Sequence, residues 1–328
     1  MIRLLPCNLQ GFFKQENIML KIQQQPYNQH INDCLLKKKE IDLYVKREDV
    51  LHKYISGNKF RKLYYNVMAA KEQHHDTLLT FGGAFSNHIA ATAAAGKEYG
   101  FKTIGVIRGD ELGKDLSKTL ADNPTLQFAA AQGMQFHFVS RKIYREKTNL
   151  DFIDNLFGKF GRFYLVPEGG TNALAVKGAE EILTPEDATF DYVCSAIGTG
   201  GTIAGIINTS HTHQKVLGFP ALKEDFLHKE IQQYVQGDNW SLIRDYHFGG
   251  FGKIDKKLVD FINMVNSLHN LPLDPIYTGK MMYGIIDLIK KDYFPKGSKI
   301  LAIHTGGLQG RAGMNWRLQK KELPLLQF

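Results

Sequence analysis

The sequence Ser56-Gly57-Asn58-Lys59 ends a loop that follows the strand-like run 41–49, and a helix begins directly after it. The apolar residues beyond it recur at the spacing of one helical face: Phe60, Leu63, Tyr64, Val67 and Met68. Lys59 therefore lies in a first helical turn, where free N–H groups and the helix dipole disfavour an ammonium. A neutral amine there can attack an aldehyde and form a Schiff base, although a solvated lysine at a helix start is the ordinary alternative.

Strand-like and helical runs alternate along the rest of the chain. Strands are predicted at 77–81, 103–107, 134–139, 163–166, 192–197, 215–219, 240–246 and 299–303. Helices are predicted at 86–99, 202–209, 224–235, 255–269 and 279–291, with one more announced by Asp122 or Asn123 as cap and Pro124 as first residue. This alternation predicts an α/β fold of open, mostly parallel sheets with helices on both faces. A length of 328 residues predicts two subdomains.

Composition narrows the class of protein. With 43% hydrophobic and 23% charged residues and no long apolar run, we expect a soluble protein that does not cross a membrane. The formal net charge of +8 is scattered along the chain, which favours attraction of small anions. Cys7, Cys34 and Cys194 are odd in number and form no CxxC pair, and the first twenty residues lack a signal-peptide pattern. We therefore expect a reducing, cytoplasmic location.

The loop Gly198-Thr199-Gly200-Gly201-Thr202 carries the clearest ligand signal. It lies between an apolar strand and a helix, so glycine N–H groups, two hydroxyls and the helix dipole converge on one point. This arrangement favours a phosphate over an empty tight turn. A dinucleotide fingerprint would need glycine where Ile203 stands, and the Walker pattern is absent from the sequence.

Two further loops lie where parallel strands are predicted to end. In the loop 82–88, Ser86 can cap the next helix and leave N–H groups for a carboxylate, while Asn87 can donate to an oxyanion. Tyr277 and Thr278 precede a helix, and the sequence His304 to Gly307 follows the last strand. Each loop alone is compatible with simple capping or packing, but ligands of such sheets collect at this edge.

Taken together, the motifs SGNK, FSNH, IGTGGT, DPIYTGK and HTGG closely resemble those of a pyridoxal-phosphate enzyme family. The family comprises the 1-aminocyclopropane-1-carboxylate deaminases and D-cysteine desulfhydrases, and the resemblance covers roughly residues 40 to 310 in the family's order. It implies the tryptophan synthase β-like fold (fold type II), with two open, twisted, mostly parallel sheets. A larger cofactor-binding domain would comprise 1–59 and 169–328, a smaller inserted domain 60–168, and the protein would be a homodimer.

The resemblance also implies roles for individual residues. Lys59 would hold pyridoxal 5'-phosphate covalently and then act on the substrate's α-proton, and Lys62 would lie beside the phosphate. The phosphate loop would be formed by Gly198, Thr199, Gly200, Gly201 and Thr202.

The remaining implied roles concern the substrate and the cofactor ring. Asn87 would hydrogen-bond the cofactor's phenolic oxygen, and Ser86, Asn87 and His88 would hold the substrate carboxylate. Tyr277 would lie beside the ring, and with Lys59 and Ser86 it completes the expected catalytic set.

Two departures from the deaminases bear on the substrate. Thr278 stands where they have a glutamate that pairs with the pyridine nitrogen, so the cofactor would be a weaker electron sink. Phe251 stands where they have a second tyrosine, and it would contact substrate without moving a proton. Since YTGK and HTGG match D-cysteine desulfhydrases, we expect β-elimination, with D-cysteine giving pyruvate, ammonia and hydrogen sulfide. Ring opening of 1-aminocyclopropane-1-carboxylate to 2-oxobutanoate and ammonia is the alternative.

Two other classes of protein are less favoured. A non-catalytic nucleic-acid-binding protein would cluster Lys and Arg with exposed aromatics, and here the charges are spread, so we expect no nucleic-acid partner. A metal-dependent hydrolase could be suggested by His74, His75, His211 and His213, but these lack the helical spacing of a zinc site. We therefore expect no metal.

Overall fold

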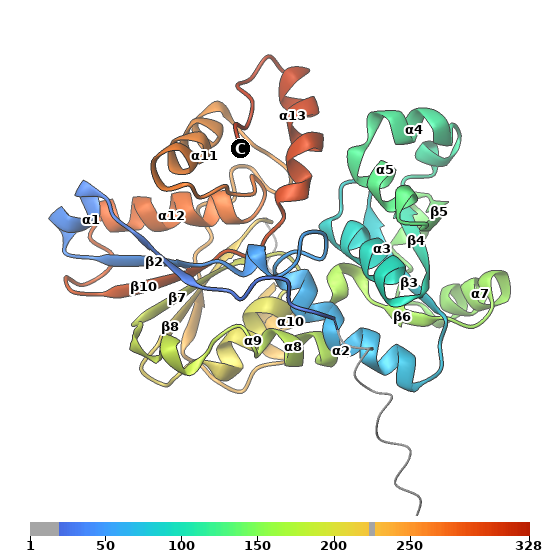
Figure 1. Cartoon of the computed structure of the whole chain (residues 1–328), viewed down its shortest axis with the longest axis horizontal. Coiled ribbons are helices and arrows are strands. Elements are labelled where there is room, and N and C mark those ends of the chain that lie inside the picture. Colours follow the sequence, from blue (N-terminus) through green and yellow to red (C-terminus); the bar gives the residue numbers. More distant parts are fainter. Residues whose placement is uncertain (1–19, 223–226) are drawn as a thin grey trace, which may run out of the picture.

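The computed structural model describes residues 20–222 and 227–328. Two sheets with helices on both faces lie side by side, as Figure 1 shows. The alternation of strands and helices and the fold class predicted from the sequence are confirmed. The first nineteen residues, which include Cys7, and part of the predicted 224–235 helix lie outside the described residues.

The larger sheet has six strands in the order β1-β2-β10-β7-β8-β9. All neighbours are parallel except β1, which runs antiparallel to β2. The strands are β1 (Asn28–Ile31), β2 (Asp42–Lys46), β7 (Tyr192–Ile197), β8 (Lys215–Pro220), β9 (Trp240–Leu242) and β10 (Lys299–Ile303).

Helices bury both faces of this sheet in separate apolar clusters (Figure 1). One face packs against α1 (Cys34–Lys39), α11 (Lys256–His269), α12 (Thr278–Lys290) and α13 (Arg311–Gln319). The other packs against α8 (Ala173–Ala179), α9 (Gly201–Thr209) and α10 (Leu227–Gln232). Burial on both faces explains why the central strands read as nearly continuous apolar runs.

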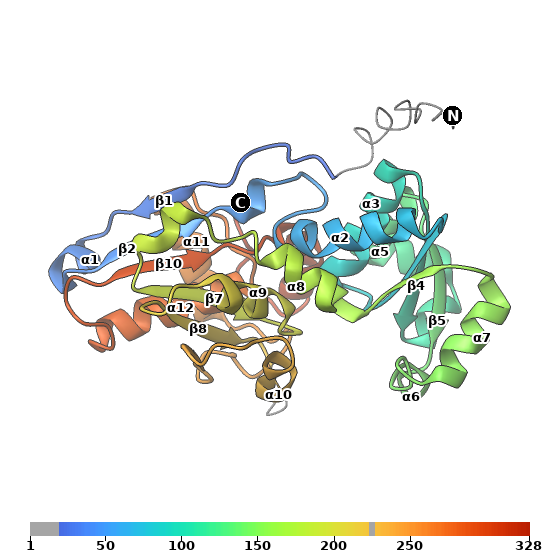
Figure 2. The same cartoon turned by 90° about the horizontal axis from the view of Figure 1, so that it is seen from below.

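The smaller sheet has four parallel strands in the order β5-β4-β3-β6. They are β3 (Thr77–Gly83), β4 (Lys102–Arg108), β5 (Gln135–Val139) and β6 (Tyr164–Val166). Helices α2 (Asn58–Glu72), α3 (Asn87–Tyr99) and α5 (Pro124–Ala131) cover one face, and α7 (Leu150–Phe160) covers the other (Figure 2). The short helices α4 (Leu116–Asp122) and α6 (Arg141–Tyr144) complete this part. The predicted domain boundaries at 60 and 168 stay a prediction.

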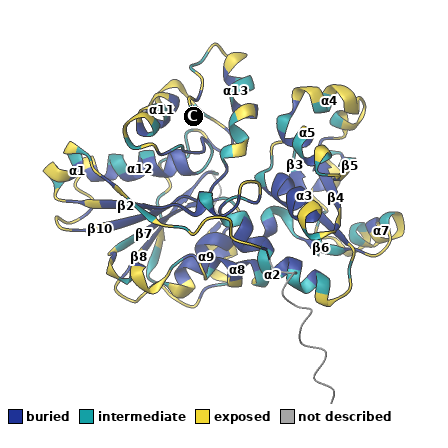
Figure 3. Cartoon of the chain, viewed as in Figure 1, coloured by how far each residue is buried: buried dark blue, intermediate teal, exposed yellow. Residues whose placement is uncertain are grey.

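Burial follows the sheets, as Figure 3 shows: the strands and the inward helix faces are buried, and exposed residues concentrate in outer turns and helix ends. Within residues 20–222 and 227–328, no helix has the length and apolar character needed to cross a bilayer.

Candidate active site

The loop before α2 is held against the loop after β10. Gly57 has φ +58°, and a Cβ there would lie only 2.1 Å from the carbonyl oxygen of Thr305, so this position requires glycine. The N–H of Asn58 donates to the same oxygen at 3.1 Å. The SGNK and HTGG motifs therefore form one structural unit, which fixes where the Lys59 side chain begins.

Lys59 extends from the first turn of α2 toward the loop after β6. Its Nζ lies 3.5 Å from the carbonyl oxygen of Gly169. Burial of the amine lowers the pKa of Lys59 from 10.5 to about 8. The direction agrees with the predicted neutral amine, but the cause differs, since desolvation dominates. Arg61, two positions after Lys59, is paired with buried Glu48 at 2.9 Å.

Lys62 lies one turn further along α2 and is 1% exposed. Its Nζ donates to the Gly169 carbonyl at 2.6 Å, to Thr171 Oγ1 at 2.7 Å and to Thr199 Oγ1 at 3.4 Å. Burial and the neighbouring Lys59 hold the pKa of Lys62 well below 10.5. The predicted phosphate neighbour thus reaches the predicted phosphate loop.

The loop from Gly198 to Gly200 connects β7 to α9, as the sequence predicted. Asn58 Nδ2 donates to Thr202 Oγ1 at 2.8 Å, which ties the start of α2 to the start of α9. A Cβ at Gly198 would lie 3.2 Å from the Tyr277 ring, so the loop and this tyrosine are in contact.

The donor set around this loop fits a phosphate. Lys62 is a buried amine whose hydrogen-bond partners are neutral, and no carboxylate in the described part of the chain forms an ion pair with it or with Lys59. Buried charge without a counter-ion is unfavourable, so an anion bound at the start of α9 would stabilise this arrangement. With the nearby Lys59 amine, the group fits pyridoxal phosphate, which is an aldehyde and a phosphate in one molecule.

The loop after β3 places Ser86 as the N-cap of α3. Its Oγ accepts from the N–H groups of His88 at 3.2 Å and Ile89 at 3.4 Å. Asn87 turns toward the loop after β10, since its Nδ2 lies 2.9 Å from where a Cβ of Gly307 would be. Capping by Ser86 is thus as the sequence suggested, and Asn87 lies beside the HTGG motif.

The side chain of His88 is directed into the interior of the small sheet. It is 1% exposed, and its Nε2 lies 2.8 Å from Thr80 Oγ1, which itself donates to the Val166 carbonyl. Burial and the two lysines hold the pKa of His88 well below 6.5, so the ring is neutral. This geometry favours a structural role for the imidazole. Since the N–H of His88 donates to Ser86, the predicted contact of His88 with the substrate stays a prediction.

Tyr277 and Phe251 lie next to each other, with ring centroids 6.1 Å apart. Burial, Asp274 and Glu168 raise the pKa of Tyr277, so its hydroxyl stays protonated. Thr278 is fully buried, and its Oγ1 accepts from the N–H of Asp274 at 2.9 Å. Phe251 is 50% exposed at the open side of this pair.

Three participants were not predicted from the sequence. The Gly169 carbonyl accepts from both lysines. Buried Asp274 accepts from the N–H groups of Tyr277 and Thr278, and its Oδ2 has no hydrogen-bond partner among the described residues. Lys280 donates to loop carbonyls near Phe251. Asp274 and Lys280 belong to the DPIYTGK motif, so that motif was the available signal for them, whereas no pattern indicates a carbonyl acceptor.

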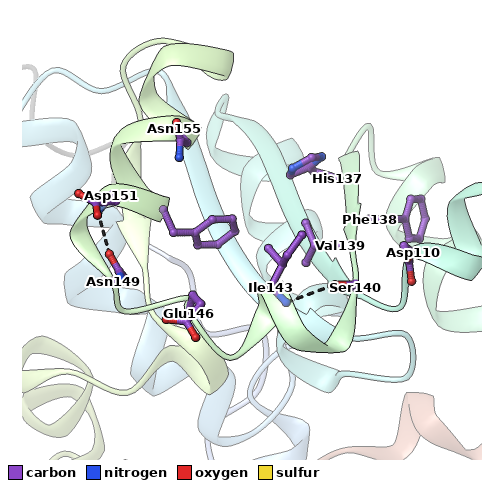
Figure 4. A pocket seen from close by; sticks show the side chains of 11 residues that line it. Asp110, His137, Phe138, Val139, Ser140, Ile143, Glu146, Asn149, Asp151 and Asn155 are labelled. Carbon is purple, nitrogen blue, oxygen red and sulfur yellow. Dashed lines mark hydrogen bonds between the residues drawn. The ribbon is translucent and has the colours of Figure 1, made fainter.

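A separate pocket lies between β5, α6 and α7, away from these residues (Figure 4). Two of its polar side chains serve as helix caps: Ser140 Oγ accepts from the N–H of Ile143, and Asn149 Oδ1 from that of Asp151. None of the predicted site residues lines it.

Comparison with known proteins places the chain in a family. Residues 30–306 match the family model described as pyridoxal-phosphate dependent enzyme. A putative 1-aminocyclopropane-1-carboxylate deaminase of Pyrococcus abyssi is 33% identical, and the match covers 82% of this chain and 86% of that protein. The bifunctional D-cysteine desulfhydrase/1-aminocyclopropane-1-carboxylate deaminase of Arabidopsis thaliana is also 33% identical, over 82% of this chain and 73% of that protein.

A solved structure described as an ACC deaminase homologue superposes with a TM-score of 0.75 at 27% identity, covering 93% of this chain and 94% of the other. The sequence match, the shared fold and the fit of Lys59, Lys62 and the loop after β7 to pyridoxal phosphate agree. The chain therefore belongs to the family of pyridoxal-phosphate dependent enzymes, in the group of the 1-aminocyclopropane-1-carboxylate deaminases.

Proposed function

We propose that this enzyme is a lyase that catalyses α,β-elimination on a small amino acid, with D-cysteine as the substrate. Water and D-cysteine would give pyruvate, ammonia and hydrogen sulfide. The observation that carries this preference is the contact between Phe251 and Tyr277, with ring centroids 6.1 Å apart. Phe251 has no proton to transfer, and by its spacing from Tyr277 it would stand where the deaminases have a second tyrosine.

Pyridoxal phosphate supplies the electron sink that stabilises negative charge on the substrate's α-carbon. The chain supplies the rest. Lys59 would hold the cofactor and, once released by substrate, take the α-proton on Nζ, for which a pKa of about 8 suits a base near neutral pH. Lys62 and the loop from Gly198 to Thr202 would bind the phosphate, and Asn87 would orient the ring.

Elimination of a thiol requires few groups beyond a base at the α-carbon and anchors for the cofactor. The leaving sulfur departs from the β-carbon, and Ser86 and the first N–H groups of α3 would orient the substrate carboxylate. Tyr277 and Phe251 would exclude water from one side of the bound substrate. A cyclopropane substrate has no comparable leaving group. Its ring opening therefore depends more on additional proton-transferring groups and on a strong electron sink.

Thr278 supports the same preference. Its hydroxyl is fully buried and engaged with the N–H of Asp274 at 2.9 Å. A threonine in that state cannot hold a pyridine nitrogen protonated as a carboxylate would.

Deamination of 1-aminocyclopropane-1-carboxylate is the second candidate, because several relatives carry that name. One of them, from Rhizobium rhizogenes, is 30% identical over 82% of this chain. The Arabidopsis relative is named for both activities, so the second candidate does not exclude the first.

Product analysis with purified holoenzyme distinguishes the two. We expect pyruvate and sulfide from D-cysteine, little 2-oxobutanoate from 1-aminocyclopropane-1-carboxylate, and loss of both the visible cofactor band and activity in Lys59→Ala. Phe251→Tyr restores the missing hydroxyl and is expected to raise 2-oxobutanoate release while leaving the cofactor band unchanged. Efficient ring opening by the unmodified enzyme would overturn the D-cysteine preference and leave the family assignment intact.

A further inference from the structure

The loop that carries Phe251 has an unusual backbone. Between β9 and α11, Phe248 has φ +53°, Gly249 +88°, Gly250 +114° and Gly252 +66°. A left-handed conformation is uncommon for a phenylalanine, and each such residue must be held in place by surrounding contacts. The position of Phe251 therefore depends on whatever fixes this loop.

Lys280 fixes it from α12. Its Nζ donates to the carbonyl oxygens of His247 and Gly250, at 2.9 Å each, and the residue is 2% exposed. The same two oxygens accept from the N–H groups of Gly250 at 3.0 Å and Lys253 at 3.1 Å, which closes the turn. Hydrogen bonds from an ammonium are stronger than neutral ones, so one side chain holds both ends of the turn.

A buried lysine would ordinarily be expected to pair with a carboxylate. Within residues 20–222 and 227–328, none forms an ion pair with Lys280. Burial outweighs the more distant Asp274 and Asp255, which act to raise its pKa, and lowers the pKa of Lys280 to about 8. Its partners are loop carbonyls instead, at the energetic cost of burying the charge.

Helix α12 connects these Lys280 hydrogen bonds to the candidate active site. Lys280 lies one turn after Tyr277 at the start of α12. The loop that Lys280 holds, residues 247–252, carries Phe251, whose ring lies next to that of Tyr277. The same helix therefore sets both members of the aromatic pair. Without the hydrogen bonds from Lys280 the loop could still form, but the position of Phe251 relative to Tyr277 would no longer be fixed.

We propose that Lys280 is a positioning residue for substrate selection: it fixes the loop 247–252 so that Phe251 forms the wall of the substrate pocket against Tyr277. The inference rests on the proposed function, in which this pair lines the pocket. It adds the residue on which the pair depends.

The first test measures hydrogen exchange of loop amides in holoenzyme. In Lys280→Met, which keeps an unbranched side chain but cannot donate, we expect the peptide covering the loop to exchange about tenfold faster, while the cofactor band is retained. Lys296→Met is the matched control, since Lys296 is exposed, forms an ion pair with Glu40 and does not touch the loop. Unchanged exchange in Lys280→Met would overturn the proposal, and this readout requires no substrate.

The second test separates positioning from general stability by a double-variant cycle. With whichever of the two amino acids the enzyme turns over, Lys280→Met should raise KM about tenfold and change kcat less than about twofold. Phe251→Leu should have a similar effect, and the double variant should be no worse than Phe251→Leu alone. Additive effects, or exchange that rises while KM stays unchanged, would show that Lys280 serves the fold only and would overturn the proposal.

Discussion

At the scale of single residues, the amine of Lys59 determines how the cofactor is taken up. Only the neutral amine attacks an aldehyde, and desolvation lowers its pKa to about 8. The neutral fraction therefore rises about tenfold per pH unit below pH 8 and levels off above it. An ordinary lysine would continue to gain reactivity up to its pKa of 10.5.

We predict that the rate at which apoenzyme regains its cofactor band rises from pH 6 to about pH 8 and then reaches a plateau. Stopped-flow absorbance with pyridoxal phosphate measures this directly. Lys59→Ala should regain no covalent band at any pH. A rate that keeps rising beyond pH 9 would show that the amine is not desolvated as the geometry implies.

Which residues could be recognised from the sequence depends on how local their signal is. Lys59 and the glycines from 198 to 201 stand beside periodic helical runs, so their place at helix starts was readable. The Gly169 carbonyl is a backbone group more than a hundred positions from Lys59, and only the folded chain brings it there. For His88, the motif was recognised, but the inward direction of the ring follows from Thr80 on the neighbouring strand.

At the scale of elements, the start of α12 organises one side of the site. Asp274 Oδ1 accepts from the N–H groups of Tyr277 at 2.5 Å and Thr278 at 3.1 Å, which satisfies donors of the first turn. Burial nevertheless raises the pKa of Asp274 from 3.8 to about 6, since those hydrogen bonds only partly offset the desolvation. The Asp274 carboxylate thus caps α12 at a cost in desolvation free energy, and this cost disappears when Asp274 is protonated.

This cost predicts a pH dependence of stability. Between pH 3.8 and about 6 the folded state binds a proton at Asp274 that the unfolded state does not, so stability from this group falls as pH rises. Two pKa units correspond to about 3 kcal/mol as an upper limit. Urea unfolding of apoenzyme at pH 4 and pH 7 should therefore show wild type gaining up to this amount at low pH relative to Asp274→Asn. A difference between the two proteins that does not change with pH would contradict the argument.

The elements themselves were predicted where periodicity is strong. Helix α12 was expected at 279–291 and spans Thr278–Lys290, and Asn123 caps α5 through the N–H of Leu126. Strand β9 was predicted to reach 246 but ends at Leu242, and the residues with positive φ in the loop that follows begin at Phe248. Strand β1 and helix α13 were missed: their sequences are largely polar, and they form by pairing with β2 and packing on the large-sheet core.

At the scale of the whole molecule, the site depends on loops from both sheets. Lys62 comes from the helix that covers the small sheet, while Thr199 follows β7 of the large sheet. That Lys62 and Thr199 lie together could be inferred from the family resemblance but not from any one motif. The homodimer and the cytoplasmic location stay predictions.

The cation of Lys62 should make the stability of the whole apoenzyme depend on anions. Without phosphate, its amine has only neutral partners, so the charged form is unfavourable and the pKa lies well below 10.5. Inorganic phosphate that binds the folded state alone should stabilise apoenzyme by about 2.7 kcal/mol at a hundred times its Kd. Lys62→Met removes the buried charge, so we expect the variant to be at least as stable as wild type without phosphate but to lose most of this stabilisation.

Thermal unfolding of apoenzyme with phosphate, and with chloride at equal ionic strength, tests this. Lys71→Met is the matched control, since Lys71 lies at the other end of α2 over the Phe101 ring and should leave the phosphate response intact. If Lys62→Met responded to phosphate as wild type does, the anion would bind elsewhere, and the assignment of the loop after β7 as the phosphate site would have to be withdrawn.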